Sequence, residues 1–433
     1  MKIISKKTLL LAISAGIAGL SLQAQATNGY FAHGYGIKSK GMAGAGVALA
    51  QDSIASATNP AAMVHLGNRW DVGGEIFAPD REARTAWGSQ TSTNTVTTYD
   101  GNGSGFGESW FLVPELGYNR MIDNNMSFGV SVFGNGGMNT SYSDQIFSAS
   151  TGGSSTSIDL MQLFVSPTIS LKLDDKNSIG VAVNLVYQRF EAKGLSDFCS
   201  LKPSGCGNPN AGLTNQGYDS SYGISFRFGW IGELTDTVSA GFSYQPKTNM
   251  KPLDKYNELF AESGDFDIPA NYTIGLSWAA TPKMTLAFDI QEIKYSHVKS
   301  IANVNNGFTG GQLGTTNGPG FGWDDMTIYK LGANFQVNKD LVVRAGYSHG
   351  NQPIPSSETL FNVIAPAVIE DHLTLGFTWA MKDGGELSGY YMHAFEETVN
   401  GTGVVAFPGA QNAGAADISM SQNAFGIAYG KKF

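Results

Sequence analysis

Apolar residues alternate with small or polar ones along most of the chain. Ile224, Phe226, Phe228 and Trp230, for example, are separated by Ser, Arg and Gly. This period of two is typical of β-strands that have one apolar face. Fourteen segments carry it, and together they predict an all-β chain: residues 68–86, 108–121, 126–140, 156–173, 177–192, 215–234, 236–252, 265–280, 283–299, 324–338, 340–350, 366–381, 385–401 and 416–433.

The connections between these segments alternate between short and long. Six short turns, such as Asp123-Asn124-Asn125, alternate with seven Gly-, Ser-, Asn- and Thr-rich loops near 87–107, 141–155, 193–214, 253–264, 300–323, 351–365 and 402–415. An even strand number with short turns at one end and long loops at the other is typical of outer-membrane barrels. A sheet in lipid must close, because no edge can stay unpaired there. We therefore expect a 14-stranded antiparallel transmembrane β-barrel over residues 68–433, with its long loops outside the cell.

Composition and charge exclude several other classes. Charged residues make up only 15% of the chain, against about 25% in soluble domains. The net charge is −9, and no basic patch points to a nucleic-acid partner. Phe, Tyr and Trp number 25, 17 and 7, which argues against a disordered chain.

The first 26 residues have the features of a secretory signal peptide. Lys2, Lys6 and Lys7 precede an uncharged stretch over residues 8–22, and a small-residue cleavage site follows at residues 24–26. Export exposes Cys199 and Cys206 to an oxidising compartment, so we expect a local disulfide between them. Two cysteines without a nearby histidine make a metal site improbable, and no motif indicates a cofactor.

Residues 27–67 lack the strand alternation and are rich in Gly and Ala. Such residues permit close backbone packing. A barrel of fourteen strands is wider than its own side chains can fill. We therefore expect this segment to be a hatch, a plug folded back into the lumen. The alternative is a loose periplasmic tail.

Glycines interrupt the third strand. Phe128, Val130 and Val132 alternate outward, and the run Phe133-Gly134-Asn135-Gly136-Gly137 then breaks the pattern. Three glycines in four residues weaken a strand and mark bulges or bends. An ordinary strand end that continues into its loop would give the same pattern.

Several stretches resemble the FadL/TodX family of outer-membrane proteins: residues 27–48 (beginning Thr-Asn-Gly-Tyr-Phe-Ala-His-Gly-Tyr-Gly), 57–63, 264–271, 344–350 and 371–377. The resemblance implies a monomeric fourteen-stranded barrel with an N-terminal hatch. It also implies passive diffusion of long-chain fatty acids or other hydrophobic compounds. In the family an Asn-Pro-Ala turn of the hatch abuts a kink in the third strand, and the kink opens a lateral gap. Here the turn corresponds to Asn59, Pro60 and Ala61, and the kink to Phe133–Gly137.

Inward-facing residues supply candidates for ligand binding. A carboxylate would need a cation, and the inward ones are Arg227, Lys330 and Arg344, among which arginine offers a bidentate fork. An apolar tail would need an apolar pocket, for which the candidates are Phe164, Phe190, Tyr30, Phe31 and Met42. Apolar residues in one long loop could form an extracellular landing site or pack the loops together: Leu253, Tyr256, Leu259 and Phe260.

An enzymatic function is not expected. Gly346-Tyr-Ser-His-Gly350 matches the nucleophile-elbow pattern, which requires a strand–turn–helix context that is missing here. A barrel lipase using Ser348 with His349 or His372 is the enzymatic alternative.

The sequence thus favours an outer-membrane channel, surrounded by lipid and lipopolysaccharide, for fatty acids or for aromatic or alkane hydrocarbons. Its substrate would leave sideways at the kink, and valines at Gly134, Gly136 and Gly137 would block uptake. A general porin for polar solutes or an adhesive surface protein would also have the alternating strands and long loops of such a barrel.

Overall fold

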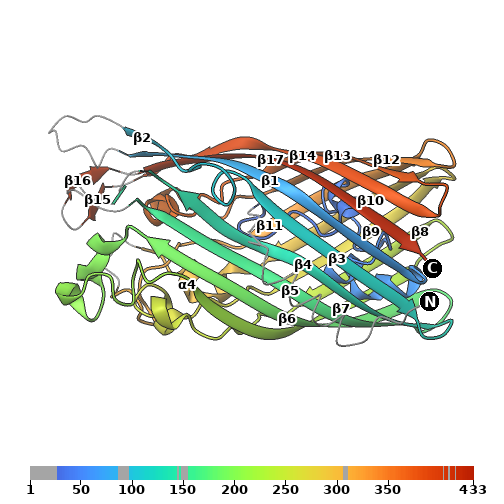
Figure 1. Ribbon diagram of the computed structural model, residues 1–433, viewed down its shortest axis with the longest axis horizontal. Coiled ribbons are helices and arrows are strands. Elements are labelled where there is room, and N and C mark those ends of the chain that lie inside the picture. Colours follow the sequence, from blue (N-terminus) through green and yellow to red (C-terminus); the bar gives the residue numbers. More distant parts are fainter. Residues whose placement is uncertain are drawn as a thin grey trace.

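The computed structural model describes residues 27–85, 97–143, 146–147, 155–305, 311–402, 404–407, 410–414 and 416–433. The signal peptide predicted over residues 1–26 lies outside them. Long tilted strands form the wall of a barrel (Figure 1). They are β1 (Arg69–Thr85), β3 (Phe111–Met121), β4 (Met126–Ser141), β5 (Ser157–Lys172), β6 (Asn177–Lys193), β7 (Asp219–Glu233), β8 (Val238–Gln245), β9 (Asn271–Thr281), β10 (Met284–Ile293), β11 (Met326–Gln336), β12 (Leu341–Gly350), β13 (Asp371–Ala380), β14 (Gly385–Val399) and β17 (Ala416–Lys432).

Each wall strand pairs antiparallel with its sequence neighbours, and the sheet closes where β17 pairs with β1. These fourteen strands confirm the predicted barrel. A further short strand, β2 (Thr97–Asp100), pairs with the part of β1 nearest the long loops, beyond the end of β3. The end of the barrel with the long loops is called its top here. The hairpin β15 (Val404–Phe407) and β16 (Ala410–Gly414) forms a separate two-stranded sheet.

The two faces of the wall differ as the alternation predicts. Outward-pointing Ile224, Phe226 and Phe228 are exposed, whereas Arg227 between them is buried inside. Similar exposed aliphatic and aromatic side chains occur on the other wall strands. The barrel therefore has an apolar outer surface, and its buried charged groups point inward, the reverse of a soluble protein.

The helical elements are single short turns in the hatch region and the long loops. They are α2 (Ile37–Lys40), η1 (Ala55–Ala57), η2 (Pro60–His65), η3 (Ser196–Leu201), η4 (Gly205–Gly207), η5 (Asp254–Tyr256), α3 (Ala261–Gly264), η6 (Tyr295–His297), α4 (Lys299–Ala302), η8 (Ser356–Glu358) and α5 (Thr359–Asn362). None of the described helices is long and apolar enough to cross a bilayer.

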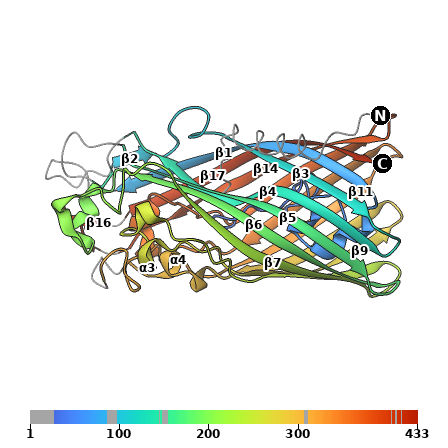
Figure 2. The ribbon, with the colours of Figure 1, turned by 60° about the horizontal axis from the view of Figure 1, so that its bottom comes forward.

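The short turns and the C-terminus lie at one end of the barrel, and the long loops lie at the other (Figures 1 and 2). The loops fold over their end of the barrel and pack into one apolar core with side chains of the lumen. This core includes Phe198, Tyr256, Trp323 and Phe361. The loops thus form a cap above the hatch.

Candidate functional site

Residues 27–67, called the hatch here, lie inside the barrel (blue in Figure 2) and are almost entirely buried. Glycines on the inner wall make this close fit possible. A Cβ atom at Gly229 would lie 1.9 Å from Asn59 Oδ1, and one at Gly346 would lie 2.2 Å from the Met42 carbonyl carbon. The same holds around the barrel for Gly117, Gly180, Gly241, Gly275, Gly332, Gly376 and Gly426. Any larger residue at these positions would displace the hatch.

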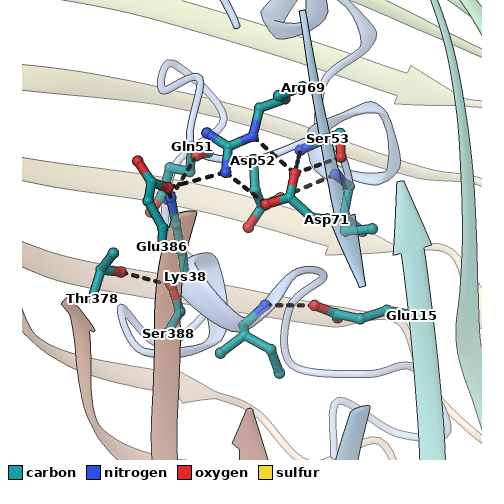
Figure 3. Close-up of polar contacts among 12 residues, drawn as sticks. Lys38, Gln51, Asp52, Ser53, Arg69, Asp71, Glu115, Thr378, Glu386 and Ser388 are labelled. Carbon is teal, nitrogen blue, oxygen red and sulfur yellow. Dashed lines mark hydrogen bonds and ion pairs between the residues drawn. The ribbon is translucent and has the colours of Figure 1, made fainter. Parts of the chain in front are cut away.

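Buried ion pairs fasten the hatch to the seam where the barrel closes (Figure 3). Lys38 of the hatch lies 2.6 Å from Glu386 of β14. Arg69 of β1 bridges Glu386, at 3.1 Å, and Asp71, at 2.6 Å. Asp71 in turn accepts a hydrogen bond of 2.9 Å from the Ser53 amide of the hatch. We call these five residues the latch.

Further carboxylates on β1, β3 and β10 hold the hatch. Glu115 of β3 accepts a 3.0 Å hydrogen bond from the Ile37 amide. Glu75 of β1 pairs with Lys40. Asp289 of β10 accepts hydrogen bonds from the amides of Gly46 (2.8 Å) and Val47 (2.9 Å). Buried charges are tolerated only when they are paired or hydrogen-bonded, so these inward acids serve to anchor the hatch.

The Asn-Pro-Ala turn lies elsewhere than the resemblance implied. Asn59 donates a 3.0 Å hydrogen bond to the Trp230 carbonyl of β7, and the Ala61 carbonyl accepts one of 3.0 Å from Ser170 of β5. Pro60 packs against Gly180 of β6. The expected contact between this turn and the strand kink is therefore wrong. Small residues on β6 and β7 accept the turn there.

The glycine run in β4 forms a bulge, which lies at residues 134–136 of the pairing with β5. On its other edge, β4 pairs with β3 over a short stretch only. This stretch begins where Met121 of β3 lies opposite Ser127 of β4 and ends where Leu116 lies opposite Val132. Above that point the hatch takes the place of β3 beside β4. The Ala32 amide donates to the Asn135 carbonyl at 2.9 Å, and the Gly137 amide donates to the Tyr30 carbonyl at 2.8 Å.

Aromatic rings surround this segment of the hatch. The Tyr30 ring lies 5.5 Å from that of Tyr295 and 6.1 Å from that of Trp323, both from the loop between β10 and β11. The Phe31 ring lies 6.1 Å from Tyr295. The Tyr295 hydroxyl donates to the Asn28 carbonyl at 2.6 Å. The predicted Tyr30 and Phe31 thus lie between the kink and the cap.

Other predicted apolar candidates divide between separate places. Phe164 stacks on Phe133 of the kink, with 5.4 Å between ring centroids. Phe190 lies 4.8 Å from both Tyr256 and Phe260, beneath the loops. Met42 packs against Gly332 and Gly346 of the wall instead. Phe164 and Phe190 thus belong to the same buried apolar core as Tyr30 and Phe31, whereas Met42 lies in a separate cluster.

The three predicted cations are also separate from one another. Arg227 donates to Gln245 Oε1 at 2.8 Å, Lys330 to the His33 carbonyl at 2.8 Å, and Arg344 to Thr378 Oγ1 at 2.8 Å. Within the described parts of the chain none of them forms an ion pair. The Nε atoms of Arg227 and Arg344 have no partner there either. Two buried guanidinium groups therefore lack a counter-ion among the described residues.

The loop residues expected as a landing site do not form one at the surface. Leu253, Tyr256, Leu259 and Phe260 are all buried in the apolar core. Leu259 and Phe260 line a small cavity, with room for about one water molecule, together with Phe190. Apolar side chains on short helical turns gain more from mutual burial than from exposure, so these residues pack the loops together.

The cap contains a disulfide and, close to the hatch, a pair of aspartates. A disulfide joins Cys199 and Cys206 in the loop between β6 and β7. In the loop before β9, Asp265 and Asp267 flank Phe266, whose ring lies 6.2 Å from Tyr30. Burial and the neighbouring Asp267 raise the pKa of Asp265 to about 7. The contact between cap and hatch therefore adjoins an ionisable pair.

Ser348 and His372, named in the enzymatic alternative, are neighbours on β12 and β13. Ser348 Oγ lies 3.2 Å from His372 Nδ1. His372 Nε2 has no partner among the described residues, so no carboxylate orients this histidine as in a catalytic triad. His349 is exposed and lies 2.9 Å from Asp371.

Sequence reasoning missed the partners of the inward charges, namely Lys38, Lys40 and Glu386, as well as Tyr295. Lys38 and Lys40 lie in the hatch, which carries no periodicity from which their direction could be read. The glycines of the inner wall did leave a signal. Gly229, for instance, holds an inward position in an alternating strand, and close backbone approach is one reason for glycine in a strand.

Comparison with known proteins agrees with this architecture. The toluene transporter TodX of P. putida superposes with a TM-score of 0.67 at 20% identity, over 93% of this chain and 99% of its own. The Ralstonia pickettii toluene transporter TbuX superposes with a TM-score of 0.64 at 18% identity, over 93% of this chain and 99% of its own. A Pseudomonas aeruginosa FadL homologue superposes with a TM-score of 0.69 at 16% identity, over 94% of this chain and 100% of its own. These likenesses show the fold.

A comparison with curated protein sequences gives no match. The family described as outer membrane protein transport protein (OMPP1/FadL/TodX) matches residues 17–433. The chain therefore belongs to the OMPP1/FadL/TodX family of outer-membrane transport proteins.

Proposed function

We propose that the protein lies in the outer membrane and lets long-chain fatty acids or similar hydrophobic compounds diffuse inward, releasing them sideways between β3 and β4. The observation that carries the proposal is the loss of pairing between these strands above Leu116 and Val132. Lipid supplies no hydrogen bonds to an unpaired strand edge, so a gap in this part of the wall supports a lateral exit. A hydrophobic ligand that leaves there enters lipid without crossing water.

The apolar outer surface supports this location. Exposed Ile76, Leu116, Phe128 and Ile169 would face hydrocarbon. Movement needs no energy source, because transfer of apolar surface from water into lipid is favourable by itself. The hatch in the lumen distinguishes this proposal from a general porin, which would conduct ions steadily.

Residues 27–32, called the gate segment here, cover the opening from inside. Two backbone hydrogen bonds tie this segment to β4, and Tyr295 holds it from above. The small cavity beside Phe190 is too small for toluene or an acyl chain. Passage therefore requires the gate segment to move away from β4 and the rings around Tyr30 to separate.

Arg227 is the proposed site for the carboxylate of a fatty acid. It is buried, its partners Gln245 and Asn271 are neutral amides, and its Nε is unpartnered among the described residues. A buried ionic group without a counter-ion in a membrane protein favours a functional role. A hydrocarbon such as toluene, which TodX and TbuX are named for transporting, would not need this group.

A reversible cross-link across the opening tests lateral release. Val113 Cγ1 of β3 lies 3.0 Å from the position of a Cβ at Gly134 of β4, and in a disulfide each sulfur lies about 3 Å from the opposite Cβ. The double variant Val113→Cys, Gly134→Cys should therefore close the opening when oxidised. We expect no uptake of labelled oleate or toluene until a reductant is added. Uptake at the original rate by the fully cross-linked protein would refute lateral release.

The substrate class is tested in the same cells. Arg227→Gln should lower oleate uptake and leave toluene uptake unchanged. The original protein with and without reductant is the control, because reductant also opens Cys199–Cys206. Loss of both activities in an assembled Arg227→Gln barrel would contradict the carboxylate role.

A further inference from the structure

The unpaired region between β3 and β4 is closed at its top. Below it, the strands pair up to Leu116 and Val132. Above it, the chain that joins β2 to β3 passes beside β4, where the Ser141 amide donates to the Gly101 carbonyl at 2.8 Å. Five residues of β3, Phe111–Glu115, lie between these limits without a partner on that edge in the described chain, which is roughly 16 Å of strand. The opening is thus a window with a complete frame.

Prolines occur where the frame lacks ladder bonds. Pro114 lies in the unpaired part of β3, and Pro79 lies in β1 between the ends of its pairings with β3 and β2. Proline lacks an amide hydrogen and is confined to such edges. The sequence therefore disfavours closure of the window by strand pairing.

Arg81 of β1 forms the upper corner of this frame. Its side chain is only 1% exposed and reaches past the end of β3 to β4. There, Nη1 donates to the carbonyl and Oδ1 of Asn139, at 2.5 and 2.9 Å. Nη2 donates to the carbonyls of Glu108, at 2.5 Å, and Asn102, at 3.3 Å. One guanidinium group thereby joins β1, β4 and the β2–β3 connection.

Arg81 lies beside a small apolar cavity at the window. The cavity has room for about one water molecule and is lined by Phe77, Phe111, Met138 and Met420 among others. On the outer face of β1, the exposed residues change from apolar Ile76 to charged Asp80 and Glu82, which flank Arg81 in the strand. The loop between β2 and β3 stands out from the wall here (Figure 2). The window therefore opens just below the upper boundary of the apolar surface.

We propose that Arg81 is a positioning residue that fixes the width of the window and so limits the cross-section of the compounds that leave through it. This inference rests on the proposed lateral release. The planar guanidinium fork is the means, because it holds acceptors on three separate segments in one plane. Lysine keeps the charge but cannot make these bonds together.

The test compares Arg81→Lys and Arg81→Gln with the original protein for uptake of toluene and of biphenyl, a bulkier hydrocarbon. Loss of even one of these hydrogen bonds loosens the frame by about fivefold in its opening equilibrium. We therefore expect the ratio of biphenyl to toluene uptake to rise by about that factor in both variants. Arg84→Gln, three residues along β1 and exposed, is the matched control and should change nothing.

An unchanged ratio in assembled Arg81 variants would overturn the proposal, as would a ratio that Arg81→Lys leaves at the original value. If both variants fail to assemble, Asn139→Ala, which removes one side-chain acceptor of Arg81, should still raise the ratio by about fivefold. The cross-link Val113→Cys, Gly134→Cys in the Arg81→Gln background separates the two ideas. Uptake that persists when the cross-link is oxidised rejects lateral release itself. If oxidation blocks uptake but the ratio of biphenyl to toluene uptake in the reduced protein is unchanged, only the role of Arg81 is rejected.

Discussion

Two glycines of the kink, two residues apart, should respond to substitution in opposite directions. A Cβ at Gly136 would lie 1.8 Å from the Tyr30 carbonyl oxygen of the gate segment, whereas one at Gly134 would lie 3.0 Å from Val113 across the window. A side chain at 136 therefore pushes the gate segment away, and one at 134 fills the opening. These contacts limit the expected closure of the window by valine to position 134.

The size of the Gly136→Ala effect follows from these contacts. Ordinary contact begins at 3.4 Å, so the Tyr30 carbonyl must retreat by about 1.6 Å. Such a shift breaks the two backbone hydrogen bonds between the gate segment and β4, each worth about 1 kcal/mol. The ratio of open to closed gate should then rise by about 30-fold.

Toluene uptake by a Gram-negative host without its own channel for hydrophobic compounds measures this change. We expect faster uptake with Gly136→Ala and slower uptake with Gly134→Val. Gly207→Ala is the control, because nothing lies within 4 Å of that position. Heat-modifiable migration checks that each barrel is assembled. If Gly136→Ala leaves both uptake and hydrogen exchange of residues 27–32 unchanged, the gate segment does not limit transport.

Three further changes test the hatch and the cap. Asn59→Ala removes hydrogen bonds to Val47, Trp230 and Ala61 and should loosen the hatch by about 3 kcal/mol, seen as ion conductance in planar bilayers where the original protein stays closed. Glu386→Gln leaves Lys38 and Arg69 without their shared carboxylate and should speed hydrogen exchange in the hatch more than Asn59→Ala does. Asp265 is protonated below its raised pKa of about 7, so its packing weakens as pH rises through 7; uptake should increase over that range, and Asp265→Asn should remove the dependence.

The sequence predicted the wall far better than the lumen. Alternation, turn spacing and strand number follow from a period of two that each strand carries by itself, and inward Arg227 and Asp289 could be read from it. The path of the hatch could not, because it has no period and its contacts come from strands far apart in the chain. For the same reason the predicted place of the Asn-Pro-Ala turn is wrong. Arg81 gives no signal of its role because it lies among exposed Asp80, Glu82 and Arg84 at the end of the apolar pattern.

The hatch is fastened unevenly, and this decides which part can move. Its body is held by buried ion pairs at Lys38 and Lys40, and breaking one such pair costs about 3–5 kcal/mol. The gate segment has two backbone hydrogen bonds to β4, two hydrogen bonds with Tyr295 and none of these ion pairs, so its four hydrogen bonds contribute about 4 kcal/mol, less than two such ion pairs. Thermal motion therefore frees residues 27–32 far more often than the body. A ligand then needs only this short segment to withdraw, since the window lies directly behind it, and the rest of the hatch keeps the lumen closed to water while the ligand leaves.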